Sequence, residues 1–367
     1  MTDKKLKIGI IGTGSISESH MKAYKNNPGV ELYAFCDLSE SRACEKSERY
    51  GVKHIFTDAG EMLKLPEIDA VSICTWNEQH APCAIAALNA GKHVLCEKPT
   101  AMSAKEAKAM KEAAEKNDKL LMIGFVRRHG NDCDILQDLI KSGYLGELYY
   151  AKATYLRKYG SPGGWFGEKE LSGGGPLIDL GVHVIDLAKY LMGNPRPISV
   201  YGVTFNKLGD RRNIKGKKIY RSESAMDYDV FNVEDLASAM IRFDNGAVLS
   251  VETSYSLHTK KDEAKIELFG TRGGAKLDPD LEVYSEINDY MMDMTPDADT
   301  AFNFDEAFQK EIDHFVDCMT KDIPCKATAQ DGIEIMKILD AIYQSAETGH
   351  EVIVKYATFK KRSSIYL

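Results

Sequence analysis

Groups that can hold or move a proton stand in two largely apolar stretches of the chain. In HVLCEKPT (93–100) a short apolar run leads directly to Lys98, and in GGGPLIDLGVHVIDLAKYLMG (173–193) Asp179 and His183 lie among apolar residues. A buried charge without a partner is costly, so each group needs either a partner or a pocket. A lysine can stabilise a negative oxygen and a histidine can accept a proton near neutral pH. The residues alone leave open whether these groups are satisfied structurally or used in a reactive pocket.

The second stretch has the pattern of a buried helix. Asp179 and His183 are four residues apart and would share one helix face, while the other positions are apolar almost all round. A satisfied core His–Asp pair is one interpretation, and a reactive site is the other. The same pair would supply two zinc ligands, but no H-E-x-x-H motif or cysteine pair stands nearby to complete the set. We therefore expect no metal here.

A glycine-rich turn stands near the N-terminus. GIIGTGSIS (9–17) places Gly12 and Gly14 between a predicted strand and a predicted helix, with Ser17 at the third position of the motif. Gly12 would permit the tight turn, and Gly14 would let a pyrophosphate approach the helix N-terminus. The alternative is a plain strand-to-helix turn.

The second strand supports dinucleotide binding, because Asp37 closes it about 20 residues further on. A carboxylate there accepts hydrogen bonds from the ribose hydroxyls and repels a 2′-phosphate, which favours NAD over NADP. Arg42 is the residue that would weaken this preference.

The surrounding pattern predicts two domains. Strand and helix patterns alternate up to about residue 125, which predicts an α/β unit with a doubly wound parallel sheet over 1–125. From 126 to 367 the strand candidates favour an α+β domain with a large, mainly antiparallel sheet, including a hairpin at FDNG (243–246). The segment SEINDYMMDMTPDAD (285–299) reads as a loop.

The composition narrows the possible partners. A formal net charge of −8 argues against a nucleic-acid partner. No apolar stretch approaches the length of a membrane span and no signal peptide is evident, so we expect no membrane partner and a cytoplasmic location. The eight cysteines form no C-x-x-C pair and fit reduced core residues.

The motifs together resemble the Gfo/Idh/MocA oxidoreductases, the family of glucose-fructose oxidoreductase and inositol dehydrogenase. The matching segments are G-T-G at 12–14, NEQHAPCAIAALNAGKHVLCEKPTAMSAKEA at 77–107, SGYLGEL at 142–148, SGGGPLIDLGVHVIDLAKYLMG at 172–193 and GTRGGAKL at 270–277. The chain departs from the family where Trp76 replaces the usual proline before Asn77.

The resemblance implies a Rossmann domain, a C-terminal domain with an open sheet, and an active site between them. It implies that Lys98, Asp179 and His183 are catalytic, with either Lys98 or His183 as the proton acceptor. The expected cofactor-binding residues are Gly12, Gly14, Ser15, Ile16, Asp37, Thr75, Asn77, His80, Glu97 and Lys98. The expected substrate-binding residues are Lys98, Arg157, Tyr159, Trp165, Asp179 and His183. Asn77 would alternatively cap the next helix, and Trp165 would alternatively be ordinary packing.

The predicted activity is NAD-dependent oxidation or reduction of a secondary alcohol on a sugar, glycoside or cyclitol. One alternative enzyme keeps its NAD bound and either couples two sugars or cleaves a glycosidic bond through transient oxidation. A second alternative is a nucleotide-sensing regulator without catalysis. The family also suggests a homodimer or homotetramer formed through the C-terminal sheet.

Overall fold

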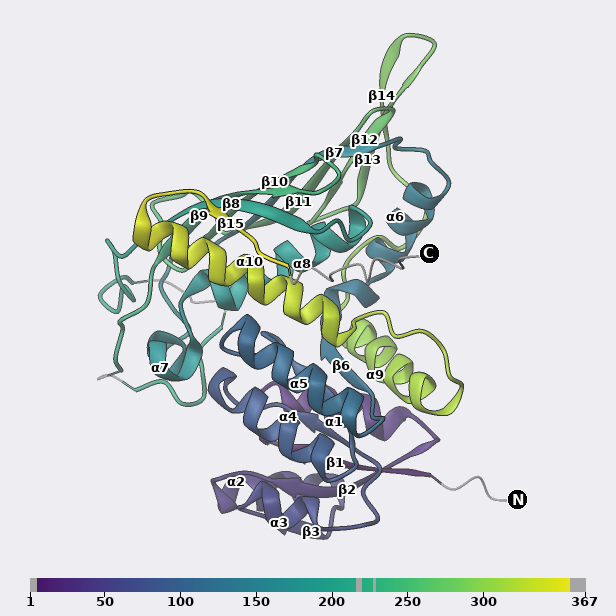
Figure 1. Cartoon of the computed structure of the whole chain (residues 1–367), viewed down its shortest axis with the longest axis vertical. Helices are drawn as coiled ribbons and strands as arrows, with labels where there is room; N and C mark the ends of the chain where they lie inside the picture. The colour runs from purple at the N-terminus through teal and green to yellow at the C-terminus, as the bar shows by residue number, and fades with distance from the viewer. Residues whose placement is uncertain (1–4, 216–219, 227–228, 357–367) are drawn as a thin grey trace, which may run out of the picture.

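The computed structural model describes residues 5–215, 220–226 and 229–356, and it contains two β-sheets that lie at opposite ends of the molecule (Figure 1). The first sheet has six strands in the order β3-β2-β1-β4-β5-β6, and every pair in it is parallel. Its strands are β1 (Leu6–Ile11), β2 (Val30–Cys36), β3 (His54–Phe56), β4 (Ala70–Ile73), β5 (His93–Glu97) and β6 (Leu121–Gly124). This order confirms the predicted doubly wound fold.

Helices cover this sheet, which is why its strands are apolar on both sides. The connecting helices are α1 (Ser17–Asn26), α2 (Glu40–Tyr50), α3 (Ala59–Leu63), η1 (Asn77–Gln79), α4 (His80–Asn89) and α5 (Ala104–Lys116). All residues of β4 are buried, as expected for a central parallel strand. Helix α5 begins as the sequence predicts, because the Ser103 side chain accepts a hydrogen bond from the backbone N–H of Glu106 at 3.3 Å.

The second sheet has nine strands in the order β14-β13-β12-β11-β7-β10-β9-β8-β15. Its strands are β7 (Leu148–Leu156), β8 (Pro197–Phe205), β9 (Leu236–Phe243), β10 (Val248–Ser254), β11 (Glu263–Gly270), β12 (Gly273–Leu277), β13 (Glu282–Ile287), β14 (Tyr290–Met294) and β15 (Val352–Ile353). The pair β7–β10 is parallel and the other pairs are antiparallel. The mainly antiparallel sheet is therefore confirmed, and so is the predicted hairpin at 243–246, which joins β9 to β10.

The prediction of a loop at 285–299 is wrong. Most of it belongs to the β13–β14 hairpin, which projects from the top of the molecule in Figure 1. Its turn residues Asn288 and Asp289 both have positive φ, as an Asn-Asp hairpin turn requires. Strand β14 is almost entirely exposed, so its sequence lacks the apolar alternation by which strands are found.

The remaining helices lie beside the second sheet or between the two sheets. They are η2 (Val126–His129), α6 (Asn131–Lys141), η3 (Gly164–Gly167), α7 (Lys169–Ser172), η4 (Leu177–Gly181), α8 (Val182–Leu191), α9 (Phe304–Thr320) and α10 (Ala329–Thr348). Helix α10 packs against both β8 and α5, and Figure 1 shows it crossing between the sheets. Among the helices of the described residues, none is long and apolar enough to cross a membrane.

Candidate active site

Lys98 and Asp179 meet between the two sheets. Lys98 directly follows β5, and Asp179 lies in η4, a single π-helical turn that leads into α8. The Lys98 ammonium donates hydrogen bonds to the Asp179 carboxylate at 3.0 Å and to the Asp179 backbone carbonyl at 3.1 Å. An ammonium has three N–H groups, so one remains for a ligand. The lysine predicted at the strand end therefore has a partner and a free donor.

The carboxylate of Asp179 is fixed from its other side by Tyr255. The buried Tyr255 hydroxyl donates to the second carboxylate oxygen at 2.9 Å. Burial alone would raise the pKa of Asp179, but the positive charges of Lys98 and Arg157 outweigh it and lower this pKa. Burial and the nearby carboxylate raise the pKa of Tyr255 well above its ordinary value. The site therefore holds an ionised Asp179 and a protonated tyrosine.

His183 faces this group without being tied to it. It lies in the first turn of α8 and is half-buried, and no hydrogen bond to its ring is found in the described part of the chain. Burial and the charges of Lys98, Arg127 and Arg157 hold the pKa of His183 well below its usual value, although Asp179 opposes the shift. The imidazole is therefore neutral at neutral pH and free to accept a proton. A satisfied pair of His183 and Asp179 is not observed, because no hydrogen bond joins the two side chains within the described residues.

The glycines before η4 let its chain approach the second sheet closely. A Cβ on Gly175 would lie 2.2 Å from the backbone carbonyl oxygen of Glu234, so no other residue fits there. The Glu234 carboxylate in turn accepts the backbone N–H of Leu177 at 3.1 Å and the Tyr343 hydroxyl at 3.0 Å. These contacts fix the turn that carries Asp179.

Glu97 is held by a histidine that the sequence analysis did not single out. The buried ring of His20, from α1, lies 2.8 Å from one carboxylate oxygen of Glu97. The other oxygen accepts the backbone N–H of Lys98 at 3.1 Å. Burial would raise the pKa of Glu97, but the His20 bond and the charge of Lys98 lower it overall. Glu97 therefore positions the start of the Lys98 turn.

The glycine-rich turn is shaped as dinucleotide binding requires. Gly12 has a φ of 86°, and a Cβ there would lie 2.7 Å from the Cys74 carbonyl oxygen. A Cβ on Gly14 would meet only the far end of the Arg42 side chain, at 3.9 Å, so the space beside Gly14 is open to a ligand. Ser17 fits the third motif position, because its buried hydroxyl donates to the Gly14 carbonyl at 2.6 Å.

Asp37 lies beside this turn at the end of β2. One carboxylate oxygen accepts the Thr13 backbone N–H at 2.8 Å, and the other accepts the Ser39 backbone N–H at 2.8 Å. Arg42 Nη1 lies 3.5 Å from the same carboxylate, and its side chain is 43% exposed. A surface pocket beside this strand end is lined by Ser39, Ser41, Arg42, Glu45, Lys46 and Glu223.

The other predicted cofactor residues differ in how deeply they are buried. Ser15 and Ile16 follow Gly14 and are half-buried, as is Thr75 just beyond the end of β4. The buried His80 has both ring nitrogens near carbonyl oxygens, those of Pro99 at 2.7 Å and Thr75 at 3.1 Å. It therefore positions the turns after β4 and β5.

Asn77 is buried and its side-chain amide donates to the Ser172 carbonyl at 2.7 Å, so it ties the end of α7 to the turn after β4. It is not a helix cap: η1 begins after Trp76 and α4 after Gln79, both without a side-chain cap. The capping interpretation is wrong.

The predicted substrate residues are less tightly gathered. Arg157 directly follows β7, and its charge acts on both Asp179 and His183. Its Nη2 donates to the Tyr155 hydroxyl at 3.1 Å, whereas its buried Nε has no partner within the described residues. Trp165 stacks on Phe166 with ring centroids 3.9 Å apart.

Tyr159 is half-buried, with the Lys158 ammonium 4.9 Å from its ring centroid. No hydrogen bond or ring contact recorded over the described ranges joins Tyr159 or Trp165 to Lys98, Asp179 or His183.

Tyr255 was not recognised as a site residue from the sequence, because its position depends on how the strands of the second sheet pair. Strands β7 and β10 run parallel, with Leu156 opposite Ser254, so Arg157 and Tyr255 follow neighbouring strands at the same edge. The sequence analysis expected antiparallel pairing in this region, which would have placed the two ends apart. The role of Tyr255 in the site could therefore be recognised only once the parallel pairing of two strands distant in sequence was known.

Comparisons with known proteins agree with this two-part fold. The profile of the oxidoreductase family with an NAD-binding Rossmann fold matches residues 6–125, and that family's C-terminal alpha/beta domain matches residues 137–354. The D-glucoside 3-dehydrogenase of Escherichia coli (strain K12) is 34% identical over 355 residues, covering 96% of this chain and 98% of the relative.

Two further similarities come from levoglucosan dehydrogenases. The enzyme of Pseudarthrobacter phenanthrenivorans is 31% identical over 295 residues, which cover 74% of this chain and 73% of the relative. A solved structure of levoglucosan dehydrogenase in complex with NADH superposes with a TM-score of 0.84 at 27% identity, covering 96% of this chain and 100% of that one. The chain is an NAD-dependent oxidoreductase and belongs to the Gfo/Idh/MocA family.

Proposed function

We propose that the protein oxidises a secondary ring hydroxyl of a sugar or glycoside. The observation that carries this proposal is the Lys98–Asp179–Tyr255 network, which leaves one ammonium N–H free. Beside it lies the ring of His183, which has no hydrogen-bond partner in the described part of the chain. A hydroxyl bound there would meet a cation and a neutral base at once. These are the two groups that alcohol oxidation needs from the protein.

His183 takes the hydroxyl proton in this proposal. Its pKa is depressed, so the ring is neutral and has a lone pair for the proton at neutral pH. Lys98 donates a hydrogen bond to the same oxygen and stabilises the negative charge that develops on it. Asp179 holds the ammonium in place. NAD, when bound, accepts the hydride from the carbinol carbon.

The residues present fit this cofactor. We assign NAD binding to residues 1–125 and substrate binding to residues 126–367. Gly12 and Gly14 leave room for the pyrophosphate at the start of α1, and Asp37 faces the same turn. Asp37 supports NAD over NADP, because its carboxylate would repel a 2′-phosphate.

The substrate class rests on the relatives and on one buried donor. The similar proteins named above act on a D-glucoside and on levoglucosan, which are both six-carbon sugar rings without a free anomeric hydroxyl. The unpartnered Nε of Arg157 is a donor beside the site, suited to a second ring hydroxyl. We propose a glycoside as substrate, with the ring hydroxyl at carbon 3 as the reacting group.

A homo-oligomer and a cytoplasmic location complete the proposal. Tyr201 of β8 and Met240 of β9 are paired neighbours, each about half exposed, and their outward face is opposite to the one covered by α10. An exposed apolar sheet face of this kind supports self-association. The cysteines of the structure are all free thiols, which fits a reducing compartment.

The test is a spectrophotometric assay of the purified protein with NAD or NADP and a panel of hexoses, methyl glucosides, levoglucosan and inositols. We expect reduced nicotinamide to form fastest with NAD and a glucoside, and the Lys98→Met variant to form almost none. Faster turnover with an inositol would contradict the glycoside assignment. No turnover from protein that releases nucleotide on denaturation would favour the retained-cofactor enzyme.

A further inference from the structure

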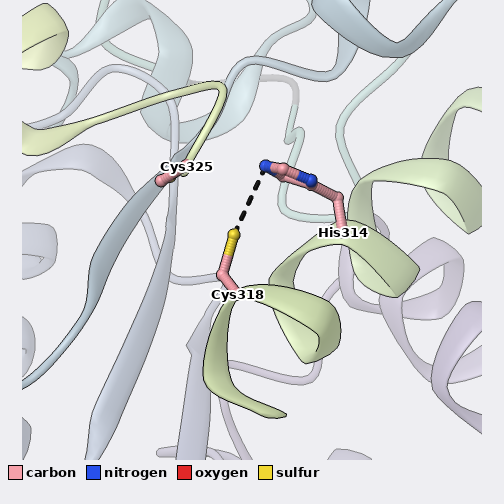
Figure 2. A group of neighbouring side chains, drawn as sticks. All are labelled: His314, Cys318 and Cys325. Carbon is pink, nitrogen blue, oxygen red and sulfur yellow. Dashed lines mark hydrogen bonds between the residues drawn. The ribbon is translucent and has the colours of Figure 1, made fainter. Parts of the chain in front are cut away.

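Two cysteines and a histidine gather at the end of α9, away from the Lys98 site. His314 and Cys318 are one turn apart on the helix, and Cys325 lies in the loop that leads to α10. One potential ligand atom from each residue lies within 4.8 Å of the other two. Figure 2 shows Cys318 and His314 pointing toward one another, with Cys318 Sγ 3.4 Å from His314 Nε2.

The donor set is typical of one class of ion. Thiolates and imidazole bind zinc, with Zn–S bonds of about 2.3 Å and Zn–N bonds of about 2.0 Å. A tetrahedron with these bonds separates its ligand atoms by about 3.5 Å, close to the spacing found between Cys318 and His314. No carboxylate belongs to the group, so calcium and magnesium, which prefer oxygen ligands, do not fit.

We propose that His314, Cys318 and Cys325 form a zinc site that fastens the end of α9 to the loop before α10. Zn²⁺ replaces the two thiol protons, which pass to solvent, so the ion and its two thiolates carry no net charge. This neutrality is compatible with the neighbouring Lys326. All three ligands are half-buried, so the ion reaches the site from solvent and a water completes the tetrahedron.

One existing contact must change and another fits this arrangement. The backbone N–H of Lys326 donates to His314 Nε2 at 2.9 Å and occupies the lone pair that zinc needs, so zinc on that nitrogen displaces this hydrogen bond. The ring of His129 lies 5.5 Å from that of His314, and its buried Nε2 has no partner within the described chain. A water on the zinc would supply such a partner.

The site would stabilise the fold rather than act on substrate. The loop that carries Cys325 is anchored to the first sheet, since the Ile123 N–H donates to the Ala327 carbonyl at 3.0 Å. The same loop accepts a hydrogen bond from Arg128 at the Lys326 carbonyl. Helix α9 is joined to the end of α1 by the bond from Asn27 to Asp313 at 2.7 Å. A zinc ion would therefore lock α9 and the loop before α10 together beside the first sheet.

The test uses the full-length protein, freed of metal by a chelator under reducing conditions and titrated with Co²⁺ and then with Zn²⁺. We expect one Co²⁺ per chain, with a thiolate-to-cobalt charge-transfer band that Zn²⁺ abolishes. Cys318→Ser and Cys325→Ser should each remove the band, and His314→Gln should weaken Co²⁺ binding at least tenfold. Cys44→Ser, which changes a half-exposed cysteine of α2, is the matched control and should keep the band.

Folding and oxidation are checked separately. Dehydrogenase turnover close to wild type shows that each variant is folded, since the cluster does not contact the Lys98 site. Zinc should raise the melting temperature of the wild type and the Cys44→Ser protein but not that of Cys318→Ser. Absence of the cobalt band in the reduced wild type overturns the proposal, and so does an equal band in the Cys318→Ser, Cys325→Ser double variant. A Cys318–Cys325 disulfide with no metal uptake after reduction overturns it as well.

Discussion

Two buried ion pairs about two turns apart on the same helical segment differ in what they leave open to a ligand. Lys98 and Asp179 meet at η4, and Arg128 and Asp186 meet at α8. The Lys98 and Asp179 side chains are 18% and 10% exposed, whereas those of Arg128 and Asp186 are each 1% exposed. The first pair keeps an ammonium donor free beside His183, whose ring has no hydrogen-bond partner among the residues that the structure describes.

The second pair, Arg128 and Asp186, is enclosed by other residues of the chain. Arg128 bonds both carboxylate oxygens of Asp186, at 2.6 and 2.9 Å, and also bonds Asp331 and the Lys326 carbonyl. Rings of Phe125 and Tyr190 lie over its guanidinium. Four of the five guanidinium N–H groups are bonded and both side chains are sealed from solvent, so no ligand can reach this cluster and it stabilises the fold. The comparison teaches that a free donor within reach of a ligand, rather than buried charge, separates a reactive site from a structural one.

The largest expected effect is on stability, from Arg128→Met. Removing the guanidinium leaves Asp186 buried without its cation, which should lower the free energy of unfolding by about 3–5 kcal/mol. Turnover per folded molecule should remain within about twofold of wild type, because Arg128 does not contact the Lys98 site. Urea denaturation and steady-state kinetics on the same preparation test both points. A large loss of turnover in folded protein would break the comparison.

Replacing the cation of the Lys98–Asp179 pair by methionine should instead lower turnover and leave stability nearly unchanged. Lys98→Met should lower kcat by about 10²–10³-fold, the loss seen when a donor to a developing oxyanion is removed. Its melting temperature and NAD affinity should change little, because Asp179 keeps the Tyr255 hydrogen bond and the charge of Arg157. Calorimetry, NAD titration and kinetics are the measurements. Near-normal kcat would rule out Lys98 as the oxyanion donor.

The fold and much of the site could be predicted because they depend on sequence patterns that span only a few neighbouring residues. Strand–helix alternation, the G-x-G turn and the Asp179–His183 spacing are each visible within a few residues. The partners of these groups are not, since Tyr255 and His20 reach the site from strands and helices distant in sequence.

The Arg128–Asp186 pair shows the same limit. Asp186 shares the helix of His183 and carries a similar pattern, yet only its contact with Arg128 shows that it is structural. Strand β14 was not predicted for a different reason. It has no buried face, so its sequence lacks the regular alternation of apolar and polar residues by which a strand is recognised.

A smaller change should affect both properties at once. Tyr255→Phe removes the hydrogen bond to the Asp179 carboxylate without leaving a large cavity. The loss of one bond to a charged group should cost about 1.5–3 kcal/mol of stability. It should also lower kcat by about tenfold, because Asp179 then holds Lys98 less firmly. Tyr50→Phe, which removes a hydrogen bond to the Glu18 carboxylate, is the matched control and should reduce stability with little effect on kcat. Equal kcat in both variants would remove Tyr255 from the site.

The smallest expected effect is the pH dependence of the wild type, and it sharpens the assignment of His183. A base of ordinary pKa, about 6.5, would lose roughly half its activity at pH 6.5. Burial and the charges of Lys98, Arg127 and Arg157 lower the pKa of His183, so kcat/KM should stay nearly constant from pH 8 to pH 6.5 and fall only at more acidic pH.

Stability should follow the same group. His183 is neutral in the folded protein, so its contribution is present above about pH 6.5 and is lost as the unfolded chain binds the proton below that value. In Lys98→Met the acid limb of the residual activity should move to higher pH, since one repelling cation has gone, while Arg128→Met should leave it in place. An acid limb at pH 6.5 in the wild type, unmoved by Lys98→Met, would mean that His183 is not the proton acceptor.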